Sequence, residues 1–126
     1  ANDEVAVIVQ IEHIDAVNRV EEILSVPGVD ACFIGPNDLA WSMGLGKGLG
    51  AKDPAHVAAI DKVLAGARKV GVPAGIHCQS VEEVMQRVDQ GFRFLACIND
   101  LNFMFRGASQ GVKQIREKIG RPAVGE

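Results

Sequence analysis

Acidic, histidine and amide side chains recur in this sequence directly after its apolar runs. They form four groups: Glu12-His13, Gly35-Pro36-Asn37-Asp38, His77-Cys78-Gln79 and Asn99-Asp100. Hard divalent cations prefer oxygen ligands and keep waters that substrate oxygens can displace. Glu12 and Asp38 could therefore converge on such a cation if the fold brings their segments together. The alternative is that each carboxylate caps a helix or binds a loop amide.

The segment Gly35–Leu39 has a composition suited to a second kind of contact. Gly35 permits close backbone approach, and Pro36 fixes a turn that is too tight and too polar to continue a strand. The amides of Asn37 and Asp38 could then point at an anionic group as a small nest. A substrate carboxylate beside a metal ion would fit this turn.

Four apolar, largely β-branched runs are the strands that would position these groups. They cover residues 5–11, 30–34, 72–76 and 92–98. Unbroken apolar runs of this kind are typical of strands buried on both faces, as in parallel sheets.

Amphipathic segments separate these strands and predict helices over residues 15–26, 53–70, 80–90 and 101–119. The N-cap candidates of the first three helices are Asp15, Asp53 before Pro54, and Ser80 with Glu83 as a capping box. Pro27-Gly28, Gly71 and Gly91 end the first three helices.

Alternating strands and helices imply a parallel sheet, since parallel neighbours need helical crossovers. A doubly wound sheet would carry a glycine-rich fingerprint after its first strand, where this chain has Glu12-His13-Ile14-Asp15. The other candidate is half of an eight-stranded barrel, in which functional groups gather at the carboxyl ends of the strands. The four polar groups at the strand ends favour the half barrel.

Composition narrows the class of partner. The 126 residues are 48% hydrophobic and carry 13 basic and 16 acidic side chains, so no nucleic-acid or membrane partner is expected. No apolar stretch approaches the roughly 20 residues of a membrane helix, and no signal-peptide pattern opens the sequence. Cys32, Cys78 and Cys97 are odd in number and widely spaced, which predicts reduced, buried thiols in a cytoplasmic protein.

Several segments in order resemble the HpcH/HpaI aldolases, the metal-dependent class II pyruvate aldolases of the 4-hydroxy-2-oxo acid type. These segments are Val9–Glu12, Val26–Asp30, Phe33–Leu39, Ser42–Gly44, Pro73–Ile76 and Gly91–Ala96. The resemblance covers nearly the whole chain. It implies that residues 1–126 are a single partial domain: an α/β fold of four β-α units with parallel strands, the C-terminal half of a (β/α)8 TIM barrel.

The resemblance also implies a set of site residues. Glu12 and Asp38 would hold Mg²⁺, Mn²⁺ or Co²⁺, which would chelate the carboxylate and keto oxygens of pyruvate. The turn formed by Gly35, Pro36, Asn37 and Asp38 would meet the pyruvate carboxylate through its backbone, with Gln10 beside the metal. The family's catalytic His base and its enolate-stabilising Arg belong to the first half of the barrel, so no residue here is assigned to those roles and the 126-residue chain is expected to be incomplete for catalysis.

The implied activity is a carbon–carbon lyase reaction, the reversible cleavage of 4-hydroxy-2-oxo acids to pyruvate and an aldehyde. No lysine lies at a strand end, which agrees with a metal mechanism rather than a Schiff base. Two alternatives stay open. One is a citryl- or malyl-CoA lyase, which would need a basic groove for coenzyme A, and the other is a non-catalytic half-barrel fragment that acts in assembly.

The remaining histidines and Asp100 have competing interpretations. His77 lies where the family has an apolar residue near the aldehyde pocket, so it either shapes substrate choice or makes a loop hydrogen bond. His13 is expected to pack behind its strand rather than act as a base, and His56 is expected to be solvated. Asp100 is expected to cap the last helix.

Two further expectations concern surfaces. Trp41 and Met43 either wall the substrate mouth or cover a subunit or core edge, and the glycine-rich run 44–50 is expected to be a flap. A half barrel exposes two sheet edges, which invite pairing with an N-terminal half or with a copy of the chain as a homo-oligomer. By the resemblance, the apolar stripe of residues 101–119 would pack on a neighbouring subunit.

Overall fold

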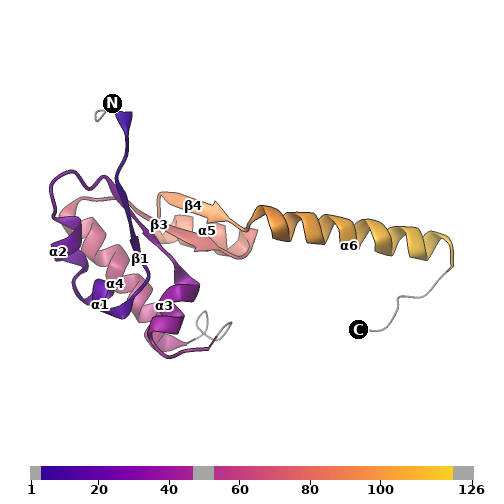
Figure 1. The fold of residues 1–126 in the computed structure, drawn as a ribbon, viewed down its shortest axis with the longest axis horizontal. Helices are drawn as coiled ribbons and strands as arrows, with labels where there is room; N and C mark the ends of the chain where they lie inside the picture. The colour runs from indigo at the N-terminus through magenta and orange to yellow at the C-terminus, as the bar shows by residue number, and fades with distance from the viewer. Residues whose placement is uncertain (1–3, 47–52, 121–126) are drawn as a thin grey trace.

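The computed structural model describes residues 4–46 and 53–120 and contains one four-stranded parallel sheet (Figure 1). The strands follow each other in the order of the sequence: β1 (Ile8–Ile11), β2 (Ala31–Ile34), β3 (Ala74–Cys78) and β4 (Phe94–Cys97). Each pairs in parallel with the next. The predicted α/β class with parallel strands is confirmed.

The helices lie between the strands and after the last one. Their bounds are α1 (Ile14–Asn18), α2 (Val20–Leu24), α3 (Pro36–Ser42), α4 (Pro54–Val70), α5 (Val81–Gln90) and α6 (Asp100–Lys118). Within the described ranges no helix is both long and apolar enough to cross a membrane. The residues predicted to form a flap fall largely at 47–52, which lie outside the described residues.

The hydrophobic core lies between the sheet and α4. Cys32 and Ile34 of β2 are paired in register with Ala74 and Ile76 of β3, and all four side chains are buried. From α4, the apolar residues Ile60, Val63, Leu64 and Ala67 complete this core. The alternation of side chains along a strand places these residues on one face of the sheet.

Gly66 brings α2 close to α4. A Cβ atom at Gly66 would lie 2.6 Å from Cγ1 of the buried Val20. The packing of the two helices therefore depends on a residue without a side chain.

The other face of the sheet is not covered by helices in the described part of the chain. Phe33 and Phe94 pack there with ring centroids 5.2 Å apart, above Gly75. A Cβ at Gly75 would lie 2.8 Å from a Phe33 ring carbon, so glycine makes room for this aromatic pair. Ile8 and Phe94 remain 44% and 48% exposed, so the prediction of burial on both faces is wrong for β1 and β4, which lie at the edges.

Two predicted helix starts differ in the structure. His13, not Asp15, is the N-cap of α1, because its Nδ1 accepts a hydrogen bond from the Asp15 amide at 3.2 Å. Asn99, not Asp100, caps α6 by accepting from the Asn102 amide at 2.8 Å. In both cases the residue one or two positions earlier has the extended backbone that an N-cap requires.

The predicted first helix is two short helices that meet at Arg19. The Arg19 backbone leaves helical geometry, with φ −114° and ψ 20°, although the predicted apolar face with Val20 and Leu24 is buried as expected. The predicted caps Asp53 and Ser80 and the helix-ending Gly71 and Gly91 are confirmed, both glycines having the left-handed backbone that favours them.

Helix α6 extends away from the sheet (Figure 1), and none of its side chains is buried. Its exposed apolar residues are Leu101, Phe103, Met104, Phe105, Val112 and Ile115. A helix with this many uncovered apolar side chains is unusual for a surface that faces water alone.

Candidate active site

The carboxyl ends of all four strands lie at one edge of the sheet, because every pairing is parallel. Glu12 follows β1 directly, and α3 with Asp38 follows the neighbouring β2. The Gly35 amide donates to the Ile11 carbonyl at 3.4 Å, which extends the pairing of these two strands to their ends. The fold therefore places the segments of Glu12 and Asp38 next to each other.

Glu12 is half-buried and held from two sides. The Gln10 Nε2 amide donates to Glu12 Oε2 at 2.6 Å. A Cβ atom at Gly35 would lie 2.7 Å from the same oxygen. Gly35 has φ −92°, which other residues also adopt, so glycine is favoured here by the space that the Glu12 carboxylate occupies and not by backbone torsion.

The segment predicted as a polar turn begins a helix instead. Pro36 is the first residue of α3, a position where its fixed φ and missing N–H are tolerated. Asn37 and Asp38 lie in the first turn with exposed side chains, and the Gly35 N-cap offers no side-chain acceptor. The first amides of a helix lack partners within the helix, so those of Asn37 and Asp38 are available to an acceptor outside it.

Ser42 fixes the other end of α3. Its Oγ accepts a hydrogen bond from the Ile14 amide at 3.0 Å and donates to the Leu39 carbonyl at 2.7 Å. The helix is thus tied to the chain just after Glu12. The sequence interpretation missed this residue.

The donor set of Glu12 and Asp38 fits a hard divalent cation, because both supply carboxylate oxygens and Asp38 is open to solvent. Over the described residues no group of three or more His, Cys, Asp or Glu side chains is placed to bind a metal ion. A cation held by these two carboxylates would therefore take its other ligands from water, substrate or residues outside the described ranges.

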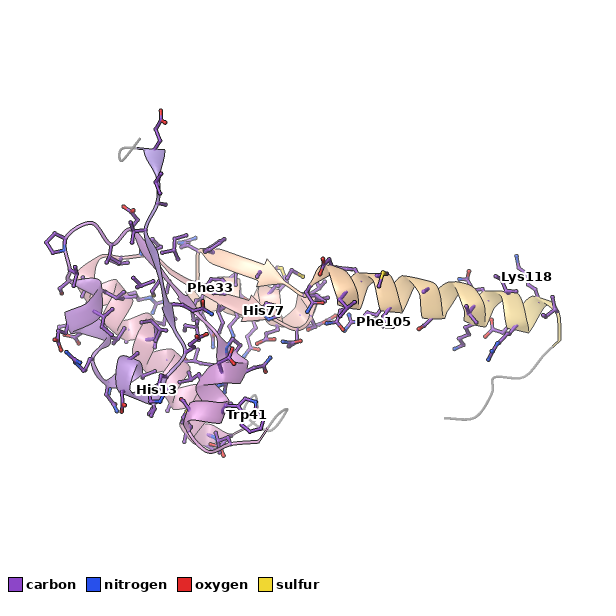
Figure 2. All side chains as sticks on the ribbon, viewed as in Figure 1. His13, Phe33, Trp41, His77, Phe105 and Lys118 are labelled. Atoms are coloured by element: carbon purple, nitrogen blue, oxygen red, sulfur yellow. The ribbon has the colours of Figure 1, made fainter. Side chains whose placement is uncertain are left out.

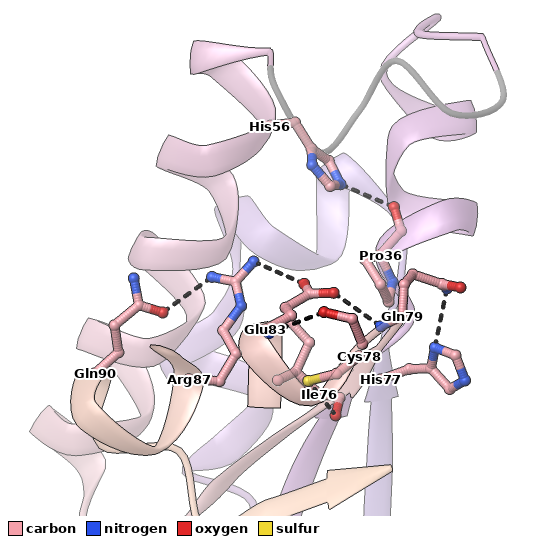
Figure 3. A network of polar contacts seen from close by, with 10 residues as sticks. Pro36, His56, Ile76, His77, Cys78, Gln79, Glu83, Arg87 and Gln90 are labelled. Carbon is pink, nitrogen blue, oxygen red and sulfur yellow. Dashed lines mark hydrogen bonds and ion pairs between the residues drawn. The ribbon is translucent and has the colours of Figure 1, made fainter. Parts of the chain in front are cut away.

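His77 lies on the uncovered face at the carboxyl end of β3, beside Ala96 of β4 (Figure 2). Its Nδ1 is 3.3 Å from Nε2 of Gln79, which fixes the ring orientation (Figure 3). The backbone N–H of Gln79 donates to Glu83 Oε2 at 2.8 Å. The loop hydrogen bond that was one of the two interpretations of His77 is therefore present.

The other two histidines differ from their predictions. His13 does not pack behind its strand; its side chain is 59% exposed and serves as the α1 N-cap. His56 is not solvated but 2% exposed, and its Nε2 lies 2.8 Å from the Pro36 carbonyl oxygen (Figure 3). A signal for this burial was available, because His56 lies one turn before Ile60 on the apolar stripe of α4.

Trp41 is 59% exposed, whereas Met43 packs partly buried against the core. Met43 therefore covers a core edge, and Trp41 is the one of the two that faces outward in the described structure.

The cysteines are free, and two of the three are buried as predicted. Burial raises the pKa of Cys32 and of Cys78 to about 11, so both thiols stay protonated at neutral pH. Cys97 is exposed, contrary to prediction, because β4 is an edge strand. The two buried thiols are thus structural and not nucleophilic.

In barrel enzymes the functional groups lie at the carboxyl ends of parallel strands, as the acidic groups do here. Residues 1–105 match the profile of the HpcH/HpaI aldolase/citrate lyase family, and the chain belongs to that family. It is similar to a hydroxypyruvate/pyruvate aldolase of Paraburkholderia phytofirmans, with 41% identity over 92% of this chain and 44% of the relative. It is also 40% identical to a 4-hydroxy-2-oxovalerate aldolase of Novosphingobium aromaticivorans, over 94% of this chain and 45% of that protein.

A solved structure supports the same assignment. The crystal structure of a HpcH/HpaI aldolase/citrate lyase family protein from Burkholderia cenocepacia has a TM-score of 0.85 and 37% identity, over 92% of this chain and 44% of that one. The chain spans less than half the length of these relatives. The predicted half of a TIM-barrel-type fold is confirmed.

Proposed function

We propose that this chain carries the metal and pyruvate sites of a divalent-metal-dependent aldolase that reversibly cleaves 4-hydroxy-2-oxo acids to pyruvate and an aldehyde. The observation that supports it most is the carboxylate of Glu12, which Gln10 fixes against Gly35 beside the helix that presents Asp38. Relatives at 41% and 40% identity carry aldolase names, which favours this function over a CoA-ester lyase.

Each residue has a role that follows from its position. Glu12 and Asp38 would hold the cation, and Gln10 orients the Glu12 carboxylate by donating to Oε2. The amides of Asn37 and Asp38 would receive the pyruvate carboxylate, since they have no acceptor within α3. The bound Mg²⁺, Mn²⁺ or Co²⁺ supplies Lewis acidity, which stabilises charge on the keto oxygen of pyruvate.

His77 would contact the aldehyde part of the substrate. It is half-buried at the carboxyl end of β3 on the same uncovered face as Gln10. A ring fixed by Gln79 presents a polar group at this place. An aldehyde with an oxygen substituent would therefore be preferred over a purely apolar one.

The site is tested by titrating Mn²⁺ into the protein in the presence of oxalate, a non-reacting mimic of the pyruvate enolate. Glu12→Ala and Asp38→Ala are expected to abolish oxalate-dependent Mn²⁺ binding, because each removes one of two carboxylate ligands. Asp61→Ala is the matched control, since Asp61 is an exposed carboxylate on α4. Unchanged binding in both site variants would contradict the proposal.

An assay of the active protein separates the aldolase from the two alternatives. Turnover of CoA thioesters with none of 4-hydroxy-2-oxo acids would identify a CoA-ester lyase. Metal binding without turnover of either substrate class would identify a non-catalytic assembly module.

A further inference from the structure

His56 is a buried polar side chain that the proposed chemistry does not use. It is 2% exposed and lies in the first turn of α4, two residues after Pro54. Its Nε2 is 2.8 Å from the carbonyl oxygen of Pro36 (Figure 3). A carbonyl oxygen only accepts, so Nε2 carries a proton and donates.

The other ring nitrogen shows that the imidazole is not there for packing alone. Among the residues that the structure describes, the buried His56 Nδ1 has no hydrogen-bond partner. A buried polar atom without a partner is destabilising, and an apolar side chain of similar size would avoid that cost. The bond to Pro36 is therefore what a histidine adds at this position.

That bond is made at the start of α3, where the helix has few other anchors. Pro36 has no N–H of its own, and the Gly35 N-cap makes no side-chain hydrogen bond. Ser42 ties the far end of α3 to Ile14. His56 and Ser42 thus hold the two ends of the seven-residue helix that carries Asn37 and Asp38.

We propose that His56 is a positioning residue for the metal and carboxylate site. By donating to Pro36, it fixes the first turn of α3, so that the Asp38 carboxylate and the amides of Asn37 and Asp38 stay in place for a metal-bound 2-oxo acid. His56 contacts no substrate. This inference rests on the proposed function. Hydrogen exchange tests separately whether His56 fixes α3.

Three variants of the full protein test the proposal. His56→Leu keeps the bulk but removes the donor, and His56→Gln restores an amide N–H near the position of Nε2. Val63→Ala is the control, because Val63 is a fully buried α4 residue that makes no hydrogen bond to α3, and its truncation lowers stability.

Two readouts are needed. In His56→Leu, KM for the 2-oxo acid is expected to rise about 3- to 10-fold, equivalent to the loss of one hydrogen bond, with a smaller change in kcat. Hydrogen exchange of amides 39–43, which are bonded within α3 or at its end, is expected to accelerate more than that of the α5 amides. His56→Gln is expected to recover most of both effects, and Val63→Ala is expected to show neither, although it lowers the melting temperature.

The outcomes separate the two claims. An inactive parent protein that binds no Mn²⁺ with oxalate overturns the proposed function, and hydrogen exchange then still shows whether His56 holds α3. Exchange at 39–43 that is unchanged in His56→Leu overturns the positioning role. So does a KM change of the same size in Val63→Ala.

Discussion

Glu12 occupies a position that two neighbouring residues shape. Gln10 donates to its carboxylate, and Gly35 leaves the space that the carboxylate fills. A metal ligand that is fixed before the metal arrives loses less conformational freedom on binding. The proposed ligand Glu12 is therefore oriented in advance by the residues around it.

Gly35→Ala tests this at the residue scale. The added Cβ would lie 2.7 Å from Glu12 Oε2, closer than such contacts allow, so the carboxylate must move. We expect Mn²⁺ affinity in the presence of oxalate to fall at least about 10-fold, in line with losses seen when ligand-orienting groups are removed. The measurement is calorimetric titration. Affinity equal to that of the parent would show that the carboxylate position does not matter.

The thiols give a second prediction for single residues. At pH 8, iodoacetamide is expected to label Cys97 in the folded protein, while Cys32 and Cys78 stay unlabelled until the protein is denatured. Mass spectrometry counts the labels. Early labelling of all three thiols would contradict the burial of Cys32 and Cys78.

The raised pKa values also set a pH dependence of stability. A thiol in the unfolded chain ionises near the ordinary value of 9.0, whereas folded Cys32 and Cys78 keep their protons until about 11. The unfolded state therefore loses protons first as the pH rises. The free energy of unfolding is expected to fall between about pH 9 and 11 and to be flat below that range for these groups, as urea denaturation at each pH would show.

At the scale of elements, two glycines in helices have opposite roles. Gly66 of α4 lets α2 approach, because a Cβ there would lie 2.6 Å from Val20. Gly107 of α6 has nothing within 4 Å of the same hypothetical atom. The same amino acid is thus required for packing in one helix and only weakens the other.

Alanine substitution is expected to change stability in opposite directions at these two sites. Gly66→Ala is expected to destabilise the fold by about 1–3 kcal/mol through overpacking. Gly107→Ala is expected to stabilise α6 by about 0.5–1 kcal/mol, because alanine loses less backbone entropy. Denaturation midpoints and helicity by circular dichroism give both values. A stabilised Gly66→Ala would show that α2 and α4 are not closely packed.

At the scale of the whole molecule, the described residues leave two apolar surfaces uncovered. One is the sheet face with Phe33 and Phe94, and the other is α6. Within the described residues, β1 and β4 are the two edge strands of the sheet. We propose that further strands cover the first surface to complete a barrel, and that α6 packs on a neighbouring subunit.

Light scattering after size exclusion tests the role of α6. Phe105 is 60% exposed in the single chain. Phe105→Glu is expected to lower the oligomer mass, because it replaces this apolar side chain by a charged one that is costly to bury in a subunit contact. Gln114→Glu changes the charge of α6 by the same amount at an exposed polar site and is the control. An unchanged mass in Phe105→Glu, or a parent protein that is a monomer, would contradict the packing of α6 on a neighbouring subunit.

The sequence by itself determined the β-α alternation, the helix-ending glycines and the family, because these depend on local propensity, on periodicity and on ordered motifs. Only the tertiary structure decided which polar residues work together. The approach of Glu12 to Gly35, the bond from His56 to Pro36 and the anchoring of α3 by Ser42 join residues of different elements. The exposure of β1, β4 and Cys97 likewise follows from their place at the sheet edges, because a residue's burial depends on what packs against it and not on its own type.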